Sequence, residues 1–181
     1  MSSTQKVLKS ISGNVAKVQL HHPRALHALD LEIVQALNDT FLELSRKNMK
    51  TMIVSSSTCR YNLNQDDLNK EKKKPPKASF CAGGDIKSMY QAAMGLNGCE
   101  ADVEGRKLLK HGYGCPSLLT TKLPHEGNNL IHKVATQPDD VPQVSIWDGI
   151  VMGGGLGLTV PGKYKIATEN SISAMPETKI G

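Results

Sequence analysis

Aromatic residues and long hydrophobic runs are both scarce in this sequence, and each absence argues against a class of partner. The 181 residues include one Trp, two Phe and four Tyr. Proteins that bind single-stranded nucleic acid stack bases on aromatic side chains, so this scarcity argues against nucleic acid. No apolar run approaches the roughly 20 residues that a membrane-spanning helix requires. We therefore expect neither nucleic acid nor a membrane as a partner of this chain.

The sequence also lacks the patterns of a metal site or a disulfide framework. The four cysteines show no Cys-x-x-Cys spacing and no matching pair of histidines; they are Cys59, Cys81, Cys99 and Cys115. His21 and His22 are neighbours at the end of an expected strand, where their side chains point to opposite faces and make a poor chelate. We expect no metal ion, and we expect reduced cysteines in a reducing compartment.

Positive charge is in slight excess, and much of it is local. Lys and Arg total 22 against 17 Asp and Glu, for a net charge of +5. Residues 70–77 contribute five lysines and one glutamate. This run lies in a polar stretch, residues 58–77, whose lack of large apolar groups predicts a solvated insertion. A modest positive bias also suits a small-molecule ligand that carries phosphate.

The N-terminal part has the pattern of a β-hairpin followed by a helix. Val7–Ser12 and Val15–His21 alternate in character around Gly13-Asn14, which predicts two strands joined by a two-residue turn. Asp30 is a good N-cap for a helix over residues 31–46, because apolar residues recur there on one helical face. We expect that face to belong to the core.

Five further apolar runs predict short strands, and two of them lead into glycine-rich turns. The runs lie at residues 52–54, 79–81, 144–146, 164–167 and 172–174. Ala82-Gly83-Gly84 follows the second run, and a helix is expected from Asp85. Asp148-Gly149 turns the chain after the third run, and Gly153–Gly155 then precede another helix. Strands alternating with helices, with glycines at their carboxyl ends, indicate an α/β domain that binds its ligand at a sheet edge.

The remaining stretches are less informative. Residues 95–127 show no clear period, and Asn128 or Asn129 is expected to cap a helix over residues 130–136. Glu169-Asn170 has the composition of a turn. For the triple glycine alone, tight packing of a helix on a strand is the commoner role. The alternative is an anion site made by free backbone N–H groups at the start of a helix.

Three segments together favour the second role. CAGGD, GIVMGGGLGL and AMPETKIG occur in this order, and the combination resembles the crotonase (enoyl-CoA hydratase/isomerase) superfamily. HHPRALHALDLEIVQAL resembles the RPxALNAL segment that opens the same family. The resemblance implies a spiral of ββα units, incomplete at the C-terminus, that forms one acyl-CoA-binding domain over residues 1–181. It also implies a homo-oligomer, trimeric or hexameric, and no cofactor, since coenzyme A is part of the substrate.

The resemblance assigns roles to particular residues. Gly84 and Gly154 would donate their backbone N–H groups to the thioester oxygen, and Glu177 would be the catalytic carboxylate. The substrate and coenzyme A would also contact six residues near these glycines: Arg24, Ala25, Leu26, Ala82, Asp85 and Ile86. Without the family motif, Pro176-Glu177 reads equally well as the ordinary start of a helix.

The carboxylates narrow the reaction. Hydratases of this family carry a glutamate at the position of Gly157, so that acid is missing here, whereas the second glutamate is present as Glu177. The pattern is most similar to one subgroup, the 3-hydroxyisobutyryl-CoA hydrolases of valine breakdown. That subgroup carries an aspartate in an LFPDVG segment, which would begin just after Gly181. Glu126 lies where the subgroup has an acidic pair, although its neighbour here is a glycine.

We therefore expect an acyl-CoA thioester hydrolase, most similar to a 3-hydroxyisobutyryl-CoA hydrolase, with Glu177 as nucleophile or general base. The alternatives are an enoyl-CoA hydratase/isomerase, or a truncated member that binds coenzyme A or a partner chain without turnover. The resemblance implies a mitochondrial location. The first 24 residues contain Lys and Arg but no acid, as a presequence does, yet a strand pattern already begins at Val7. A cytoplasmic location is the alternative.

Overall fold

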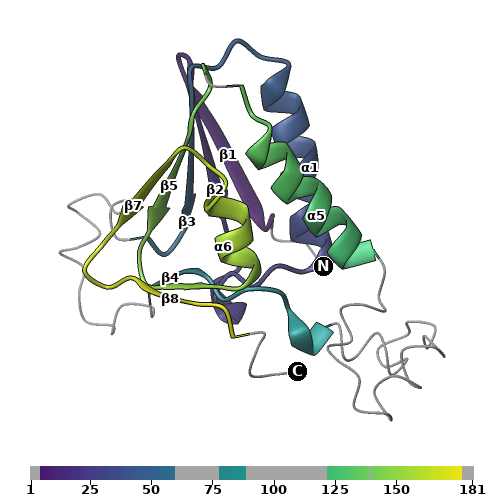
Figure 1. Cartoon of the computed structure of the whole chain (residues 1–181), viewed down its shortest axis with the longest axis vertical. Helices are drawn as coiled ribbons and strands as arrows, with labels where there is room; N and C mark the ends of the chain where they lie inside the picture. The colour runs from purple at the N-terminus through teal and green to yellow at the C-terminus, as the bar shows by residue number, and fades with distance from the viewer. Residues whose placement is uncertain (1–4, 60–77, 89–121, 139, 177–181) are drawn as a thin grey trace.

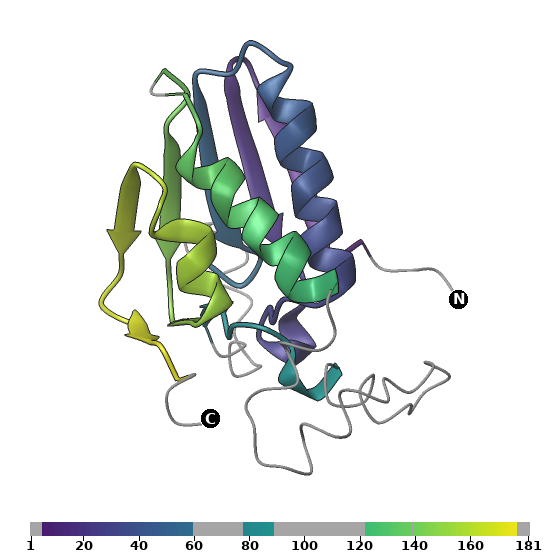
Figure 2. The same ribbon diagram turned by 45° about the vertical axis from the view of Figure 1, so that its right-hand side comes forward.

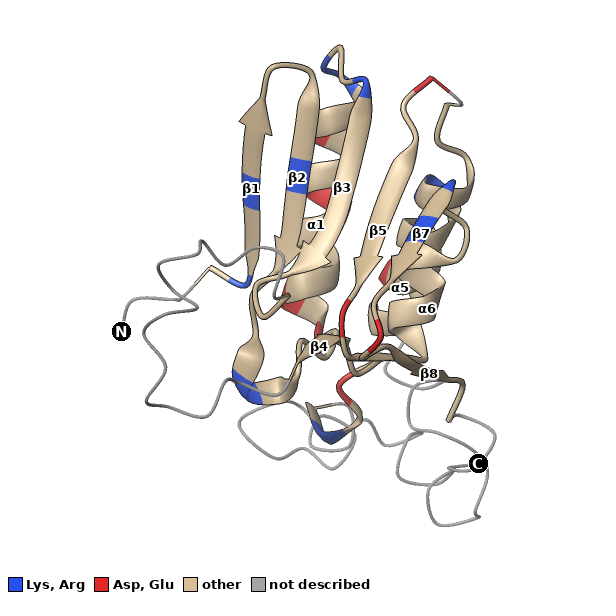
Figure 3. Ribbon diagram, turned by 90° about the vertical axis from the view of Figure 1, so that its left-hand side faces the viewer, with Lys and Arg blue, Asp and Glu red and all other residues tan. Residues whose placement is uncertain are grey.

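Two sheets at an angle to one another, with helices on one face of the larger, make up the part of the chain that the structure describes. The computed structural model describes residues 5–59, 78–88, 122–138 and 140–176. The larger sheet has the order β1-β2-β3-β5-β7 and the smaller sheet the order β4-β6-β8. Helices α1 and α5 lie side by side over one face of the larger sheet, with α6 beside them (Figures 1 and 2). Figure 3 shows the opposite face, with the helices behind the strands.

The strands and helices have the following bounds. The larger sheet comprises β1 (Val7–Ser12), β2 (Val15–Leu20), β3 (Thr51–Ser56), β5 (Gln143–Trp147) and β7 (Tyr164–Ala167). The smaller sheet comprises β4 (Ser79–Cys81), β6 (Ile150–Met152) and β8 (Ile172–Ala174). The helices are the 3₁₀ turn η1 (Pro23–Ala25), α1 (Leu31–Ser45), α5 (Lys122–Ala135) and α6 (Gly154–Thr159). None of these described helices is long and apolar enough to cross a membrane.

The β1–β2 hairpin is the antiparallel pair of the larger sheet, and its prediction is confirmed. Ser12 pairs with Val15, so the loop holds two residues. Gly13 has a positive φ of 56°, a conformation that glycine adopts without a steric penalty. β2–β3, β3–β5 and β5–β7 are parallel, as are both pairs of the smaller sheet.

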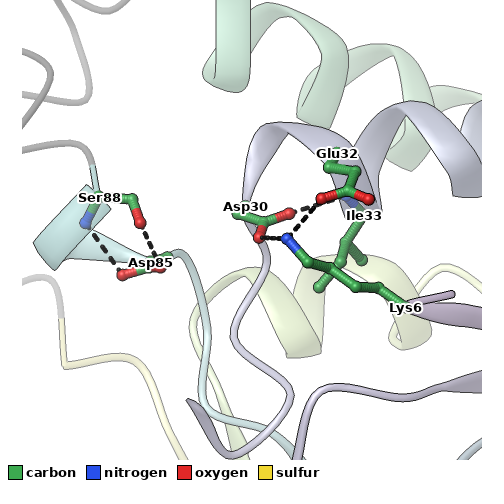
Figure 4. Close-up of polar contacts among 6 residues, drawn as sticks. All are labelled: Lys6, Asp30, Glu32, Ile33, Asp85 and Ser88. Atoms are coloured by element: carbon green, nitrogen blue, oxygen red, sulfur yellow. Dashed lines mark hydrogen bonds and ion pairs between the residues drawn. The ribbon is translucent and has the colours of Figure 1, made fainter. Parts of the chain in front are cut away.

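Helix α1 starts at its predicted cap. The Asp30 carboxylate accepts a hydrogen bond from the Ile33 N–H at 2.8 Å, which satisfies one of the free donors of the first turn. Lys6 forms ion pairs with Asp30 at 2.5 Å and with Glu32 at 2.6 Å, and so connects the start of the helix to the entry of β1 (Figure 4). The apolar face of α1 is buried as predicted; its buried apolar residues are Ile33, Val34, Leu37, Phe41 and Leu44.

The chain passes from the larger sheet into the smaller one through two stacked corners. The first corner joins β5 to β6 and the second joins β7 to β8. Thr168 donates from its hydroxyl to the buried Asp148 carboxylate at 3.0 Å, and the Ile172 N–H donates to the Gly149 carbonyl at 2.9 Å. Gly149 has φ +83°, and a Cβ there would lie 1.9 Å from the Ala78 carbonyl oxygen. The predicted turns at 148–149 and 169–170 are therefore confirmed, and each turn redirects the chain between the sheets.

Two local expectations from the sequence were incomplete or wrong. Strand β6 was not anticipated, because its three apolar residues lie between glycines, where the sequence pattern indicates a glycine-rich turn instead. The expected cap at Asn128 or Asn129 is wrong, because α5 already begins at Lys122 and both asparagines lie inside it, exposed. Packing of α5 on α1 outweighs the weak preference of asparagine for a helix end.

Candidate functional site

The two glycine-rich turns predicted from the sequence lie next to one another in the fold. The first glycine turn (residues 82–84) leaves β4, and the second glycine turn (residues 153–155) leaves β6. β4 and β6 are paired in parallel, so both turns emerge at the same edge of the smaller sheet. A Cβ placed on Gly154 would lie 3.6 Å from the Gly84 nitrogen and 3.9 Å from the Gly83 carbonyl carbon. Gly84 and Gly154 are thus in near contact although the sequence separates them widely.

Both of these glycines offer a backbone donor. Gly154 is the first residue of α6, where an N–H has no acceptor within the helix. Neither the Gly84 N–H nor the Gly154 N–H donates a hydrogen bond to an acceptor within the described residues. Two unused donors so close together can bind one negatively charged oxygen.

The other glycines of the two turns allow the close approach. Gly83 has φ +100°, and a Cβ there would lie 3.1 Å from the Met152 carbonyl oxygen. A Cβ on Gly155 would lie 2.8 Å from the Cys81 Cβ and 3.1 Å from the Cys81 carbonyl oxygen. Any side chain at position 155 would therefore push α6 away from β4.

Residues from the 24–29 segment hold the first glycine turn. The Ala82 N–H donates to the Leu26 carbonyl at 3.0 Å, which joins the two segments at one end. The Leu29 N–H donates to the Gly83 carbonyl at 2.7 Å, and the Asp85 N–H donates to the Leu29 carbonyl at 2.9 Å. These two bonds are made on either side of Gly84 and fix the orientation of its peptide group.

The other residues expected at the site surround this junction. Arg24 and Ala25 belong to η1 and directly precede Leu26, with Arg24 exposed. Asp85 accepts hydrogen bonds from the Ser88 N–H at 3.1 Å and the Ser88 hydroxyl at 2.5 Å (Figure 4). Its carboxylate thus caps the helical turn over residues 86–88. Ile86 is 44% exposed beside it.

Cys81 borders the glycine turns but has the wrong ionisation for a nucleophile. Its side chain is buried, and burial raises the pKa of the thiol to about 12, against a smaller lowering by a hydrogen bond from the Gly83 N–H. The thiol is therefore protonated at neutral pH and packs as a small apolar group. Cys59 is also buried, while Cys99 and Cys115 lie outside the described residues.

Three positions were considered for a carboxylate from the sequence, Gly157, Glu126 and Glu177, and the outcome is different at each. A Cβ on Gly157 would lie 2.8 Å from the Ile131 Cδ1, so this position faces α5 and is filled by an apolar neighbour. Glu126 accepts from the Asn38 side-chain amide at both its carbonyl (3.0 Å) and its carboxylate (3.1 Å), which ties α5 to α1. Glu177 lies outside the described residues. The described chain before it is held at the site edge, because the Gly153 N–H donates to the Ala174 carbonyl at 3.1 Å.

One buried polar residue near the site was not singled out from the sequence. His27 is fully buried and accepts at Nδ1 from the His22 N–H at 2.9 Å, while its Nε2 lies 3.0 Å from the Thr58 hydroxyl. The pKa of His27 is lowered to about 4, mainly because the ring is buried. Electrostatic repulsion from His21 and His22 makes a smaller contribution in the same direction. The signal was present in HHPRALHAL, where the related motif has asparagine and this chain has histidine. Thr58 was assigned to the solvated insertion, most of which lies outside the described residues.

A profile of the enoyl-CoA hydratase/isomerase family matches residues 15–181. The chain belongs to this family. The resemblance of its glycine segments to the crotonase superfamily is therefore confirmed. Enoyl-CoA hydratase/isomerase relatives with solved structures share the fold: one from Marinobacter aquaeolei superposes with a TM-score of 0.69 at 24% identity. The superposition covers 97% of this chain and 53% of that one, which confirms a partial crotonase-like α/β fold.

The curated relatives of this chain include hydrolases and a ribosomal protein. The mitochondrial 3-hydroxyisobutyryl-CoA hydrolase of Dictyostelium discoideum is 36% identical over 181 residues, which are 99% of this chain and 39% of that protein. The small ribosomal subunit protein mS47 of Neurospora crassa is 32% identical over 93% of this chain and 26% of that protein. This chain thus spans less than two-fifths of the length of these relatives.

The packing around the glycines predicts opposite effects for two Gly→Ala changes. Gly155→Ala should lower the free energy of unfolding by about 1–3 kcal/mol, because the new methyl group would overlap Cys81. Gly127→Ala, in the middle of α5 with nothing within 4 Å of its Cβ, should raise it by about 0.5–1 kcal/mol. Urea unfolding of both variants measures the difference. Equal effects would mean that position 155 is not in close contact.

Burial of neutral His27 predicts a pH dependence of stability. Its pKa falls from 6.5 to about 4 in the folded chain, so the unfolded chain binds the proton more readily between these values. Neutral His27 therefore makes its full contribution to the free energy of unfolding above pH 6.5. This contribution, up to about 3 kcal/mol, is lost as the pH falls towards 4. Denaturant unfolding between pH 7 and 4 should show a steeper loss for the native chain than for His27→Asn. Parallel curves would contradict this prediction.

Proposed function

We propose that this chain contributes the acyl-CoA-binding part of a thioester hydrolase for 3-hydroxyacyl-CoA, with 3-hydroxyisobutyryl-CoA as the first substrate to test. The observation that carries the proposal is the near contact of Gly84 and Gly154, each with an unused backbone donor. The named hydrolase relatives support the choice of reaction.

The chemistry requires stabilisation of a negatively charged oxygen. Attack on a thioester moves charge from the carbonyl bond onto its oxygen, and two N–H groups that point at this oxygen lower the barrier by about 3 kcal/mol each in a dry site. Gly84 and Gly154 would supply these two donors. Glu177 would act either as nucleophile or as general base for water, and both roles are consistent with a carboxylate at this place in the motif.

The position of Gly157 favours hydrolysis over hydration. Hydration of a double bond in this family uses a carboxylate at that position, by the resemblance described above. Here the position has no carboxylate and faces Ile131, so even an added side chain would meet α5. The proposed site therefore retains the oxygen-binding donors and one carboxylate.

The proposal includes the setting of the reaction. The Arg24–Leu26 segment and the residues around Asp85 would contact coenzyme A, which enters as part of the substrate, so no separate cofactor is needed. We place the protein in the mitochondrion, as the names of several relatives suggest, and in a homo-oligomer.

A second function is favoured by a specific observation. The Neurospora relative is named as a ribosomal subunit protein, so a chain similar to this one carries a name that describes an assembly and no reaction. This chain could bind coenzyme A or a protein partner without turnover. Binding of coenzyme A in a calorimeter without any release of thiol from acyl-CoA would favour this second function.

The decisive experiment measures release of free thiol from a panel of acyl-CoA thioesters by the protein that contains this chain. We expect hydrolysis of 3-hydroxyisobutyryl-CoA and none of crotonyl-CoA. If crotonyl-CoA is hydrated and 3-hydroxyisobutyryl-CoA is not hydrolysed, the proposal is wrong and the protein is a hydratase. Glu177→Gln should lower kcat by orders of magnitude with little change in KM.

A matched pair at position 154 tests the backbone donor. Gly154→Pro removes the N–H at the first position of α6, where proline is tolerated, while Gly154→Ala adds a Cβ and keeps the N–H. The alanine variant is the needed control because its Cβ would lie 3.2 Å from the Leu29 Cδ1. We expect proline to reduce kcat about 100-fold or more below alanine. Equal activities would assign position 154 to packing alone.

A further inference from the structure

A chain of hydrogen bonds runs beneath the first glycine turn and is not part of the proposed chemistry. It starts at the His22 N–H, passes through His27 and Thr58, and ends at the Ser79 carbonyl, with heavy-atom distances of 2.9, 3.0 and 3.0 Å. His27 has no exposed surface. It therefore does not touch a ligand, and its effect must pass through its neighbours.

The direction of the bonds is determined by their first donor. A backbone N–H can only donate, so the Nδ1 of His27 must be the unprotonated acceptor and Nε2 must carry the hydrogen. Nε2 then donates to the Thr58 hydroxyl, which donates in turn to the Ser79 carbonyl. Every donor in the chain has one acceptor, and only a neutral histidine satisfies both ends.

The same residues determine the path of the segment that holds Gly84. Leu26 and His27 both have a positive φ, at 51° and 57°, a backbone conformation that residues other than glycine and asparagine seldom adopt. The Leu26 carbonyl accepts from the Ser79 hydroxyl and from the Ala82 N–H, both at 3.0 Å. Three residues after Leu26, the backbone of Leu29 forms hydrogen bonds with Gly83 and Asp85, the residues on either side of Gly84.

We propose that His27, acting through Thr58 and Ser79, is a positioning residue that holds the 26–29 segment in its unusual backbone path and thereby aims the Gly84 N–H. The inference rests on the proposed function for the purpose of that N–H, whereas the mechanical link can be tested by itself. A shift of Leu29 would turn the Gly84 peptide, because both bonds that orient this peptide end on Leu29.

Two variants break the chain of hydrogen bonds at different places. His27→Asn tolerates a positive φ and retains an acceptor near Nδ1, but it is too short to reach Thr58. Thr58→Val has almost the same shape as threonine and removes the hydroxyl that joins His27 to Ser79. His21→Asn is the matched control, since His21 contacts the Ser57 hydroxyl at 2.8 Å in the same way, but its side chain makes no hydrogen bond to the 26–29 segment in the described part of the chain.

The first measurement is amide hydrogen exchange and is independent of activity. We expect His27→Asn and Thr58→Val to speed exchange at Leu29, Ala82 and Asp85 at least tenfold, with the amides of α1 unchanged. His21→Asn should leave all of them unchanged. Unaltered exchange at the three amides in both variants would overturn the proposal, as would an equal increase throughout α1, which would indicate general destabilisation.

The second measurement is the kinetics of thioester hydrolysis. We expect each variant to reduce kcat about tenfold or more with KM nearly unchanged, and the double variant His27→Asn/Thr58→Val to be no worse than the stronger single one. Additive losses would mean that the two residues act separately and would overturn the proposal. If the native chain hydrolyses no thioester, the proposed function fails, and the exchange experiment alone decides the role of His27.

Discussion

The candidate site depends on how closely the backbone of β4 approaches the start of α6. Gly83 and Gly155 make this approach possible because they have no Cβ. A Cβ on Gly83 would crowd Met152, and a Cβ on Gly155 would crowd Cys81, so either would force β4 and α6 apart. Only this approach brings Gly84 and Gly154 together. The smaller sheet pairs β4 with β6 in parallel, so the two turns that leave these strands meet at one edge without any side-chain link. The shape of the site is therefore a property of the main chain.

A main-chain site needs support from outside the sheet, and the segment before α1 provides it. Leu26 and Leu29 use their backbone groups as partners for the first glycine turn, in place of a neighbouring strand. Asp30 then starts α1, and Lys6 joins that start to β1. The site is thus connected through successive polar contacts to β1, the edge strand of the larger sheet.

Elements with a local signal could be predicted from the sequence. The hairpin at Gly13, the cap at Asp30 and the turn at Gly149 each follow from the chemistry of one or two residues, and all three are confirmed. The start of α5 could not be predicted, because packing against α1 decides it and Asn128 gives a misleading capping signal. The adjacency of Gly84 and Gly154 was inferred only from resemblance, since no local pattern reports which strands pair. His27 was overlooked because a lone histidine in a loop reveals neither its burial nor its backbone angles.

The parallel pairing of the larger sheet also has a consequence for how the chain folds. Apart from the hairpin, each pairing in that sheet joins residues from distant parts of the sequence, as Met52 with Gln143 shows. The closure of such long loops costs entropy before the contacts form, and chains of this topology fold slowly. During synthesis, the hairpin and α1 emerge well before β5, so they must wait with an apolar helix face unpaired. A chaperone that covers that face until β5 and α5 arrive would therefore benefit this protein more than one whose contacts are local.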